Sequence, residues 1–165
     1  MHASKFFVVA LALCLVGCAS STVVRQPLQL SKEITPAATK YSVGKISTQT
    51  SDAPEHFLAA VKGHLKLELS KHGLLANEDS IDPYETVITV NSYRMRSGFS
   101  RAMFGVFAGK DGIDSTVTVT DSKSGRVIGE SQVSSYNMMA VGGEDDVARM
   151  HAEEIAKFLS SGNKN

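Results

Sequence analysis

Three histidines, His56, His64 and His72, recur at intervals of eight residues and are the first side chains to consider as metal ligands. The apolar pattern around them predicts one helix, in which an eight-residue step turns a side chain by about 80°. Two imidazoles that share a metal on a helix are usually four residues apart, on one face. The three histidines therefore do not converge, and we expect them on the surface, with no metal bound.

The sequence also lacks the common patterns that place a catalytic nucleophile or metal beside a base. His151 precedes Glu153 and Glu154, but this order lacks the His-Glu-x-x-His spacing of zinc-dependent hydrolases. We interpret His151 as a half-buried packing residue of a second predicted helix. Serine is frequent, yet no Gly-x-Ser-x-Gly turn presents one as a nucleophile. We therefore expect a protein that is not an enzyme and that needs no cofactor.

Gly142-Gly143, just before that second helix, could present backbone N–H groups to an anion. The next three residues, Glu144, Asp145 and Asp146, carry negative charge and would repel it. Acidic side chains in the first turn of a helix stabilise the helix dipole. We expect these residues to cap the helix rather than to leave an anion site.

Cys18 is the one residue whose surroundings predict a definite modification. Lys5 and the apolar run from Phe6 to Val16 fit a secretory signal, and the run is too short for the roughly 20 residues of a membrane span. The tetrapeptide Leu15-Val16-Gly17-Cys18 resembles the lipobox of bacterial lipoproteins. The resemblance implies cleavage between Gly17 and Cys18 and acylation of Cys18, and two or more acyl chains would give a stable anchor. The alternative is an ordinary cleaved signal in which Cys18 is incidental.

Processing at this site would change the rest of the chain. Cys14 would leave with the signal and Cys18 would carry lipid, so no free thiol would remain for a disulfide, a metal or catalysis. Removal of residues 1–17, the signal peptide, leaves 148 of the 165 residues, the usual size of one domain. The charges then number 16 basic and 17 acidic, so no net field favours a nucleic acid partner.

The mature chain divides into three parts. Residues 18–40 are rich in Ser, Thr, Gln and Ala, contain Pro27 and Pro36, and show no sustained period, which predicts a lipidated, flexible tether. As an alternative, Val23 to Leu30 pairs as an edge strand. We expect a single periplasmic domain over residues 41–160 and a disordered tail over residues 161–165.

The domain begins with a predicted strand, Tyr41 to Thr48, and a helix. Asp52 and Glu55 predict an acidic variant of the capping box around Pro54, and Gly73 predicts the end of the helix. The apolar stripe of this helix consists of Phe57, Leu58, Val61, Leu65 and Leu69.

Beyond Pro83, alternation of apolar with polar residues predicts three strands. One runs through Tyr93, and two form a hairpin over residues 113–136 around a turn at 121–125, with an exposed face of Thr, Ser and Gln. Residues 145–159 predict a closing helix with one apolar face. The order strand-helix-strand-strand-strand-helix indicates an α+β fold, with two helices packed on one face of a small, mainly antiparallel sheet.

Residues 94–109, between the second and third of these strands, break the expected pattern. Such a connection is normally short and polar, but this one carries aromatic and other apolar residues interleaved with small ones. Gly105 and Gly109 have small-xxx-small spacing, in a stretch too short to span a bilayer. Either the aromatic side chains fill the core, or the segment is a surface patch that binds a partner or a lipid. The candidate contact residues are Arg94, Arg96, Arg101, Phe104, Gly105, Phe107 and Gly109.

Several of these placements together resemble a known family. An arginine precedes Gly105 and Ala108-Gly109, a valine strand ends in Asp121, and the turn Ser124 to Gly129 comes before an alanine-rich closing helix. Over roughly residues 40–160, this pattern is similar to bacterial lipoproteins grouped as domain of unknown function 4410. The resemblance implies a periplasmic α/β sandwich, similar to accessory lipoproteins of envelope assembly and transport machines, and it brings no catalytic residues.

Two functions remain open at this stage. In the first, a non-enzymatic envelope lipoprotein uses residues 99–109 and a sheet edge to dock an envelope protein or another copy of itself. In the second, a lipid-handling or transport-auxiliary lipoprotein uses the same segment to shield acyl chains. Ala19, rather than Asp, follows the modified cysteine, and by resemblance to Gram-negative lipoproteins this implies the outer membrane, facing the periplasm.

Overall fold

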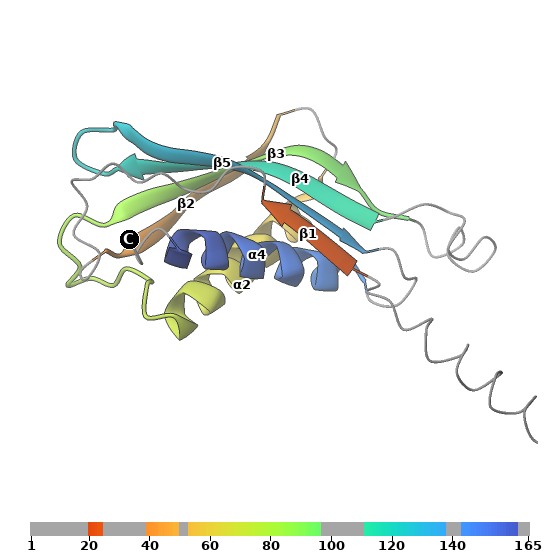
Figure 1. Cartoon of the computed structure of the whole chain (residues 1–165), viewed down its shortest axis with the longest axis horizontal. Helices are drawn as coiled ribbons and strands as arrows, with labels where there is room; N and C mark the ends of the chain where they lie inside the picture. Colours follow the sequence, from red (N-terminus) through yellow and green to blue (C-terminus); the bar gives the residue numbers. More distant parts are fainter. Residues whose placement is uncertain (1–19, 25–38, 50–52, 97–110, 138–142, 162–165) are drawn as a thin grey trace, which may run out of the picture.

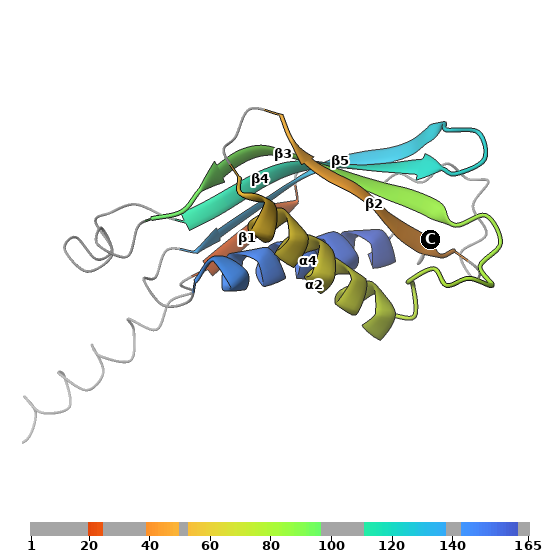
Figure 2. The ribbon, with the colours of Figure 1, turned by 180° about the vertical axis from the view of Figure 1, so that it is seen from behind.

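The computed structural model describes residues 20–24, 39–49, 53–96, 111–137 and 143–161. They form two layers, a five-stranded sheet and two helices against one of its faces (Figure 1, and from behind in Figure 2). The elements are β1 (Ser20–Val24), β2 (Tyr41–Thr48), α2 (Glu55–Lys71), β3 (Tyr84–Arg94), β4 (Asp111–Asp121), β5 (Val127–Asn137) and α4 (Glu144–Ser161). The predicted α+β fold, with both helices on one face, is confirmed.

The strands lie in the order β1-β5-β4-β3-β2. Neighbouring strands are antiparallel except for β2 and β3, which are parallel. This pair is parallel because α2 connects the two strands and returns the chain to the end where β2 began. The sheet is therefore mainly antiparallel, as predicted, with β4 as its central strand.

Part of the segment predicted as a flexible tether is a strand of the sheet. Ser20 to Val24 pairs with β5, from Asn137 to Val133, in antiparallel register. The alternative strand, Val23 to Leu30, shares only Val23 and Val24 with β1. The tether prediction is therefore wrong for residues 20–24, where valine and threonine suit a strand; residues 25–38 lie outside the described residues.

The start of α2 differs from the predicted capping box, and its end agrees with the prediction. Pro54 occupies the N-cap position, and no side chain of the described residues caps the helix there. Asp52 lies outside the described residues. Proline suits a helix start because its missing N–H would have no partner in any case. At the other end His72 is the C-cap, and Gly73 follows with a φ of 66°, a conformation that glycine adopts without strain.

The predicted hairpin of β4 and β5 is confirmed, and its turn is held by a side chain. The Asp121 carboxylate accepts hydrogen bonds from the N–H groups of Lys123 and Ser124, both at 2.9 Å. The Ser124 N–H contributes most to holding the pKa of Asp121 below its usual value. Gly125 has a φ of 67° and donates its N–H to the Asp121 carbonyl at 2.8 Å, which closes the turn.

Apolar side chains fill the space between the helices and the sheet. The predicted stripe of α2 is buried at Phe57, Val61, Leu65 and Leu69. Burial of each such side chain stabilises the folded state by about 1.5–3 kcal/mol. The ring of Phe57 meets that of Tyr93 edge to face, with centroids 4.8 Å apart. The predicted face of α4 is also buried, at Val147, Ala148, Ala152, Ile155, Phe158 and Leu159.

The prediction for the outer face of the hairpin is wrong in part. Threonines of β4 alternate with buried residues and point away from the helices, as predicted. Ser115, Ser131 and Ser135, however, are buried on the helix side of the sheet. A buried hydroxyl needs a hydrogen-bond partner, because leaving it unsatisfied costs about 1–3 kcal/mol.

Candidate functional site

A buried imidazole joins α4 to two strands of the sheet. The Ser115 Oγ of β4 lies 2.7 Å from the His151 Nε2, and the Ser135 Oγ of β5 lies 2.9 Å from the His151 Nδ1. A neutral imidazole donates from one nitrogen and accepts at the other, and each hydroxyl can do either. This set of three residues, which we name the histidine bridge, therefore satisfies both ring nitrogens.

The histidine bridge contains the groups of a nucleophile and a base, but it is sealed from solvent. Ser115 is 1% exposed, and both Ser135 and His151 are 0% exposed. Burial lowers the pKa of His151 to about 4, against the opposing effect of the negative charge on Asp114. The imidazole is therefore neutral at neutral pH, and no substrate reaches it while α4 lies on the sheet. The bridge connects the two layers of the fold.

The prediction that His151 is half-buried is wrong, and the sequence does contain a signal for its true position. Ser115 and Ser135 fall on the inward positions of their strands, in step with Ile113 and Val133. His151 falls on the buried stripe of α4. Inward polar residues on facing elements indicate a mutual contact, because each needs a partner in the same dry layer.

A buried ion pair lies where β3 ends and β4 begins. The Arg96 Nε is 3.1 Å from the Asp111 Oδ1 and the Arg96 Nη2 is 3.3 Å from the Oδ2. The backbone N–H of Arg96 also donates to the Asp111 Oδ1, at 2.7 Å. The two side chains are 3% and 2% exposed. This bidentate arrangement pairs both charges where water is scarce, so it holds together the two ends of the connection formed by residues 97–110.

The structure describes two of the candidate contact residues. Arg94 is exposed at the end of β3. The prediction that Arg96 contacts a partner is wrong, because its guanidinium is buried against Asp111. The remaining predicted positions lie outside the described residues: Gly17, Cys18, Arg101, Phe104, Gly105, Phe107 and Gly109.

The acidic start of α4 contacts both α2 and β3. Glu144 accepts a hydrogen bond from the Tyr93 hydroxyl, and its Oε2 lies 3.0 Å from the His56 Nε2. Burial, and then the hydrogen bond to Glu144, raises the pKa of Tyr93 well above its ordinary value. The next residue, Asp145, has its Oδ1 2.8 Å from the His64 Nε2. The contact of Glu144 with His56 brings the first turns of the two helices together at one end of the sheet, and the contact of Asp145 with His64 joins the start of α4 to the middle of α2.

The expected capping role of the acidic residues is visible at Asp146, whose Oδ2 accepts the Gly143 N–H at 3.2 Å. The sequence prediction missed the α4 partners of the α2 histidines, since those contacts join residues more than 80 positions apart. Among the described residues, no three His, Cys, Asp or Glu side chains are grouped as a metal site requires. Over the same ranges, neither helix combines the length and the apolarity that would cross a membrane.

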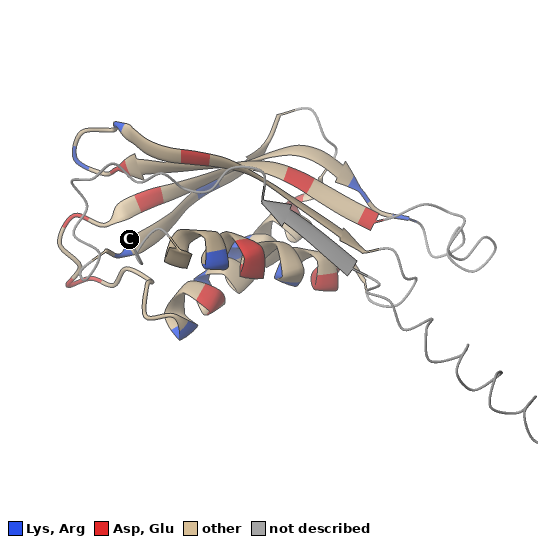
Figure 3. Cartoon of the chain, viewed as in Figure 1, with Lys and Arg blue, Asp and Glu red and all other residues tan. Residues whose placement is uncertain are grey.

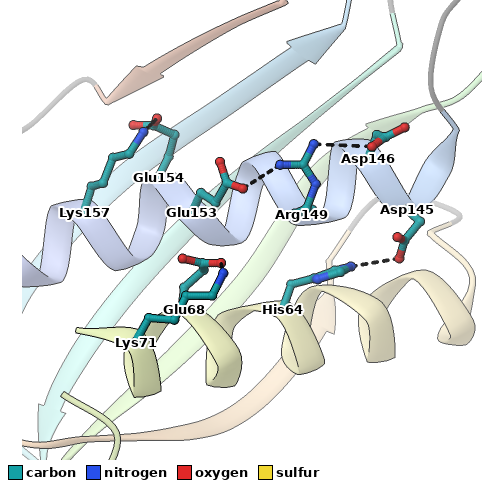
Figure 4. Close-up of polar contacts among 9 residues, drawn as sticks. All are labelled: His64, Glu68, Lys71, Asp145, Asp146, Arg149, Glu153, Glu154 and Lys157. Carbon is teal, nitrogen blue, oxygen red and sulfur yellow. Dashed lines mark hydrogen bonds and ion pairs between the residues drawn. The ribbon is translucent and has the colours of Figure 1, made fainter. Parts of the chain in front are cut away.

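The outer surface of the helix layer carries charges of both signs (Figure 3). Arg149 pairs with Glu153 at 2.6 Å and with Asp146 at 3.3 Å, and Lys157 pairs with Glu154 at 2.6 Å (Figure 4). Exposed pairs of this kind contribute only about 0.3–0.5 kcal/mol each. Their main consequence is a strongly hydrated surface on this side of the domain.

The other face of the sheet is polar too, and no described helix covers it (Figures 1 and 2). The Asn91 Nδ2 donates to the Thr116 Oγ1 at 2.8 Å, and the Tyr136 hydroxyl donates to the Asp114 Oδ1 at 2.7 Å. The Tyr136 ring also lies against Gly112, where an added Cβ would be 2.4 Å from the ring. Both broad faces of the domain are therefore hydrophilic.

The fold is similar to that of PelC from Paraburkholderia phytofirmans, which crystallised as a dodecamer. One PelC structure has a TM-score of 0.60 and 16% identity, covering 85% of this chain and 98% of that one. A second has a TM-score of 0.58 and 14% identity, covering 86% and 97%. Protein XCC0632 from Xanthomonas campestris, of the family DUF330, has a TM-score of 0.52 and 10% identity, covering 76% and 90%. At these identities the likeness shows a shared fold.

No curated protein matches this chain in sequence. The family described as "Domain of unknown function (DUF4410)" matches residues 24–143, which include every described strand from β2 to β5 and the whole of α2. The resemblance stated from the sequence is thereby confirmed, and the chain belongs to the DUF4410 family.

Proposed function

We propose that this protein is a non-enzymatic envelope lipoprotein whose α+β domain is an assembly module that binds other copies of itself or an envelope protein. The fold shared with PelC, a protein seen as a dodecamer, carries the proposal, because the likeness covers nearly the whole of that chain. The burial of the histidine bridge also supports a role other than catalysis, since its serine hydroxyls do not meet solvent.

Residues 99–109 are the proposed contact segment. Their sequence combines aromatic residues with Gly105 and Gly109, a composition typical of close packing against another surface. The buried pair of Arg96 with Asp111 fixes the two points from which the segment leaves the sheet. With Arg96 assigned to that pair, the proposed contacts are Arg94, Arg101, Phe104, Gly105, Phe107 and Gly109.

Gly105→Arg tests the contact segment. We expect the variant to lose assembly, measured by sedimentation of the detergent-solubilised protein, while its melting temperature stays close to that of the wild type. Gly63→Arg is the matched control, because Gly63 is exposed on α2 and a side chain there would meet open space. If Gly105→Arg instead lowers the melting temperature strongly while Gly63→Arg does not, the segment is part of the core and the proposal fails.

The anchor has its own test. We propose that Cys18 carries acyl chains that hold the protein at the outer membrane, facing the periplasm. Metabolic labelling with an alkyne fatty acid should mark the wild type and the Cys14→Ser variant, and leave Cys18→Ser unmarked. Separation of inner and outer membranes should then place the labelled protein in the outer fraction. Labelling that survives Cys18→Ser would contradict the assigned attachment site.

A further inference from the structure

The position of β1 in the sheet constrains how the domain sits on a membrane. This inference rests on the proposed acylation of Cys18. Only Ala19 separates Cys18 from Ser20, the first residue of β1. Two residues of fully extended chain span at most about 7 Å. The lipid would therefore attach almost directly to a strand that is hydrogen-bonded into the domain, without a long flexible linker.

The strand register identifies which end of the domain lies beside the lipid. Ser20 pairs with Asn137, Asn137 pairs with Asp111, and Gly112, next to Asp111, pairs with Arg94. The contacts of Glu144 with Tyr93 and His56 place the first turns of both helices at this same end. We name it the anchor end, and in Figure 1 it is the end at which β1, β4 and α4 begin.

The opposite end of the domain, which we name the distal end, contains the turn from Asp121 to Arg126. The Lys123 Nζ and the Asp82 Oδ2, 2.5 Å apart, join that turn to the residues before β3. Between the two ends, β4 runs from Asp111 to Asp121 without a break. Ten steps along an antiparallel strand cover about 34 Å, which is the approximate length of the domain in this direction.

Among the described residues, neither broad face of the domain offers an apolar surface that would hold it flat among the acyl chains of the lipid. The outer surface of the helices carries paired charges, such as Arg149 with Glu153 and Lys157 with Glu154 (Figure 4). The uncovered face of the sheet carries Thr116, Thr118 and Gln132 among other polar residues. Placing either face against acyl chains would remove water from polar groups without giving them new partners.

We infer that the domain stands end-on, with the anchor end against the lipid surface and the distal turn facing away from the membrane. The short connection from Cys18 to β1 sets the orientation, and no positively charged patch is needed for it. The most exposed large apolar side chains of the described residues, Ile81 at 89% and Val127 at 55%, belong to the distal end. They are therefore presented away from the bilayer, toward other proteins of the envelope.

Single labels at the two ends test this orientation. Because Cys14 leaves with the signal and Cys18 is acylated, Ser92→Cys and Ser122→Cys each supply the one free thiol of the protein. Both serines are exposed, Ser92 near the end of β3 and Ser122 in the distal turn. The acylated protein is reconstituted in phosphatidylcholine vesicles, and energy transfer from the label to a headgroup acceptor gives its height. We expect the Ser122 label to lie about 25 Å farther from the headgroups than the Ser92 label.

A flexible insertion provides the matched control. Twelve Gly and Ser residues placed between Ala19 and Ser20 have a root-mean-square span of about 20 Å and should abolish the height difference. The same twelve residues placed after Ser161 should leave it unchanged. Equal heights in the acylated wild type, or a Ser122 label nearer the lipid, would overturn the end-on orientation and leave the anchor intact. An intact mass without acyl chains would overturn the anchor itself, and the orientation with it.

Discussion

The histidine bridge should make the stability of the domain fall as the pH falls. In the folded protein burial holds the pKa of His151 at about 4, whereas the unfolded chain has the ordinary value of 6.5. Below pH 6.5 the unfolded state therefore takes up a proton that the folded state refuses, and the free energy of unfolding decreases. At pH 7.5 neither state is protonated and this loss is absent.

The size of the effect follows from the two pKa values. Each unit of pH between them changes the free energy of unfolding by about 1.4 kcal/mol, so the loss at pH 5 relative to pH 7.5 is about 2 kcal/mol. Below pH 4 it levels off at about 3 kcal/mol. Asp114, the charged group that opposes the shift, keeps these values from being larger.

Urea unfolding of the mature domain at a series of pH values measures this loss. The contributions of all other groups are removed by comparison with His151→Gln, whose side chain is neutral at every pH. We expect the wild type to lose about 2 kcal/mol more than His151→Gln between pH 7.5 and pH 5. Equal losses in the two proteins would refute the assignment. If His151→Gln does not fold, the NMR shift of the His151 imidazole in the wild type, followed as the pH is lowered, tests the same assignment. A titration midpoint near 6.5 in the folded protein would refute a sealed bridge.

Three further predictions concern buried groups of the sheet. Within the described part of the chain, the buried hydroxyl of Thr86 has no hydrogen-bond partner. Thr86→Val should therefore raise the free energy of unfolding by about 1–2 kcal/mol, whereas Thr89→Val on the opposite face should not. Urea titration compares the two variants, and a loss of stability in Thr86→Val would contradict the reasoning. Asp111→Asn leaves the Arg96 guanidinium buried without its counter-charge and should lower the free energy of unfolding by about 3–5 kcal/mol, measured as a lower thermal midpoint. The control is Asp82→Asn, at a more exposed ion pair, which should lower it by less than about 1 kcal/mol. Gly112→Ala places a Cβ against the Tyr136 ring and should lower the free energy of unfolding by about 1–3 kcal/mol. This loss should be smaller in a Tyr136→Ala background. An unchanged loss would show that the strain does not come from the Tyr136 ring.

The elements that the sequence predicted well are those specified by local chemistry. Gly73 ends α2 by its own backbone preference, and Asp121 with Gly125 closes the hairpin within six residues. The apolar period of each helix likewise marks its buried face without knowledge of the partner element. The prediction of two helices on one face of an antiparallel sheet followed from these local signals.

The features that were missed depend on contacts between distant residues. Ser20 to Val24 is a strand only because β5, more than 100 residues later, offers a free edge. The local sequence predicts Arg96 as an exposed cation, because its partner, Asp111, lies on the far side of residues 97–110. The histidine bridge joins three elements, and its residues, two serines and a histidine, are of types that are often found on a protein surface. Local propensity carries no information about such pairs.

The buried pair of Arg96 with Asp111 also makes the connection between β3 and β4 a natural place for sequence to change in length. The pair and the strand register below it, Arg94 with Gly112, already hold the two ends of this connection side by side. Doubling the length of a flexible connection between fixed ends costs only about 0.6 kcal/mol of closure entropy. Insertions, deletions or grafted sequences between residues 97 and 110 should therefore leave the scaffold folded, so the length of this part of the chain can change while the sheet is retained.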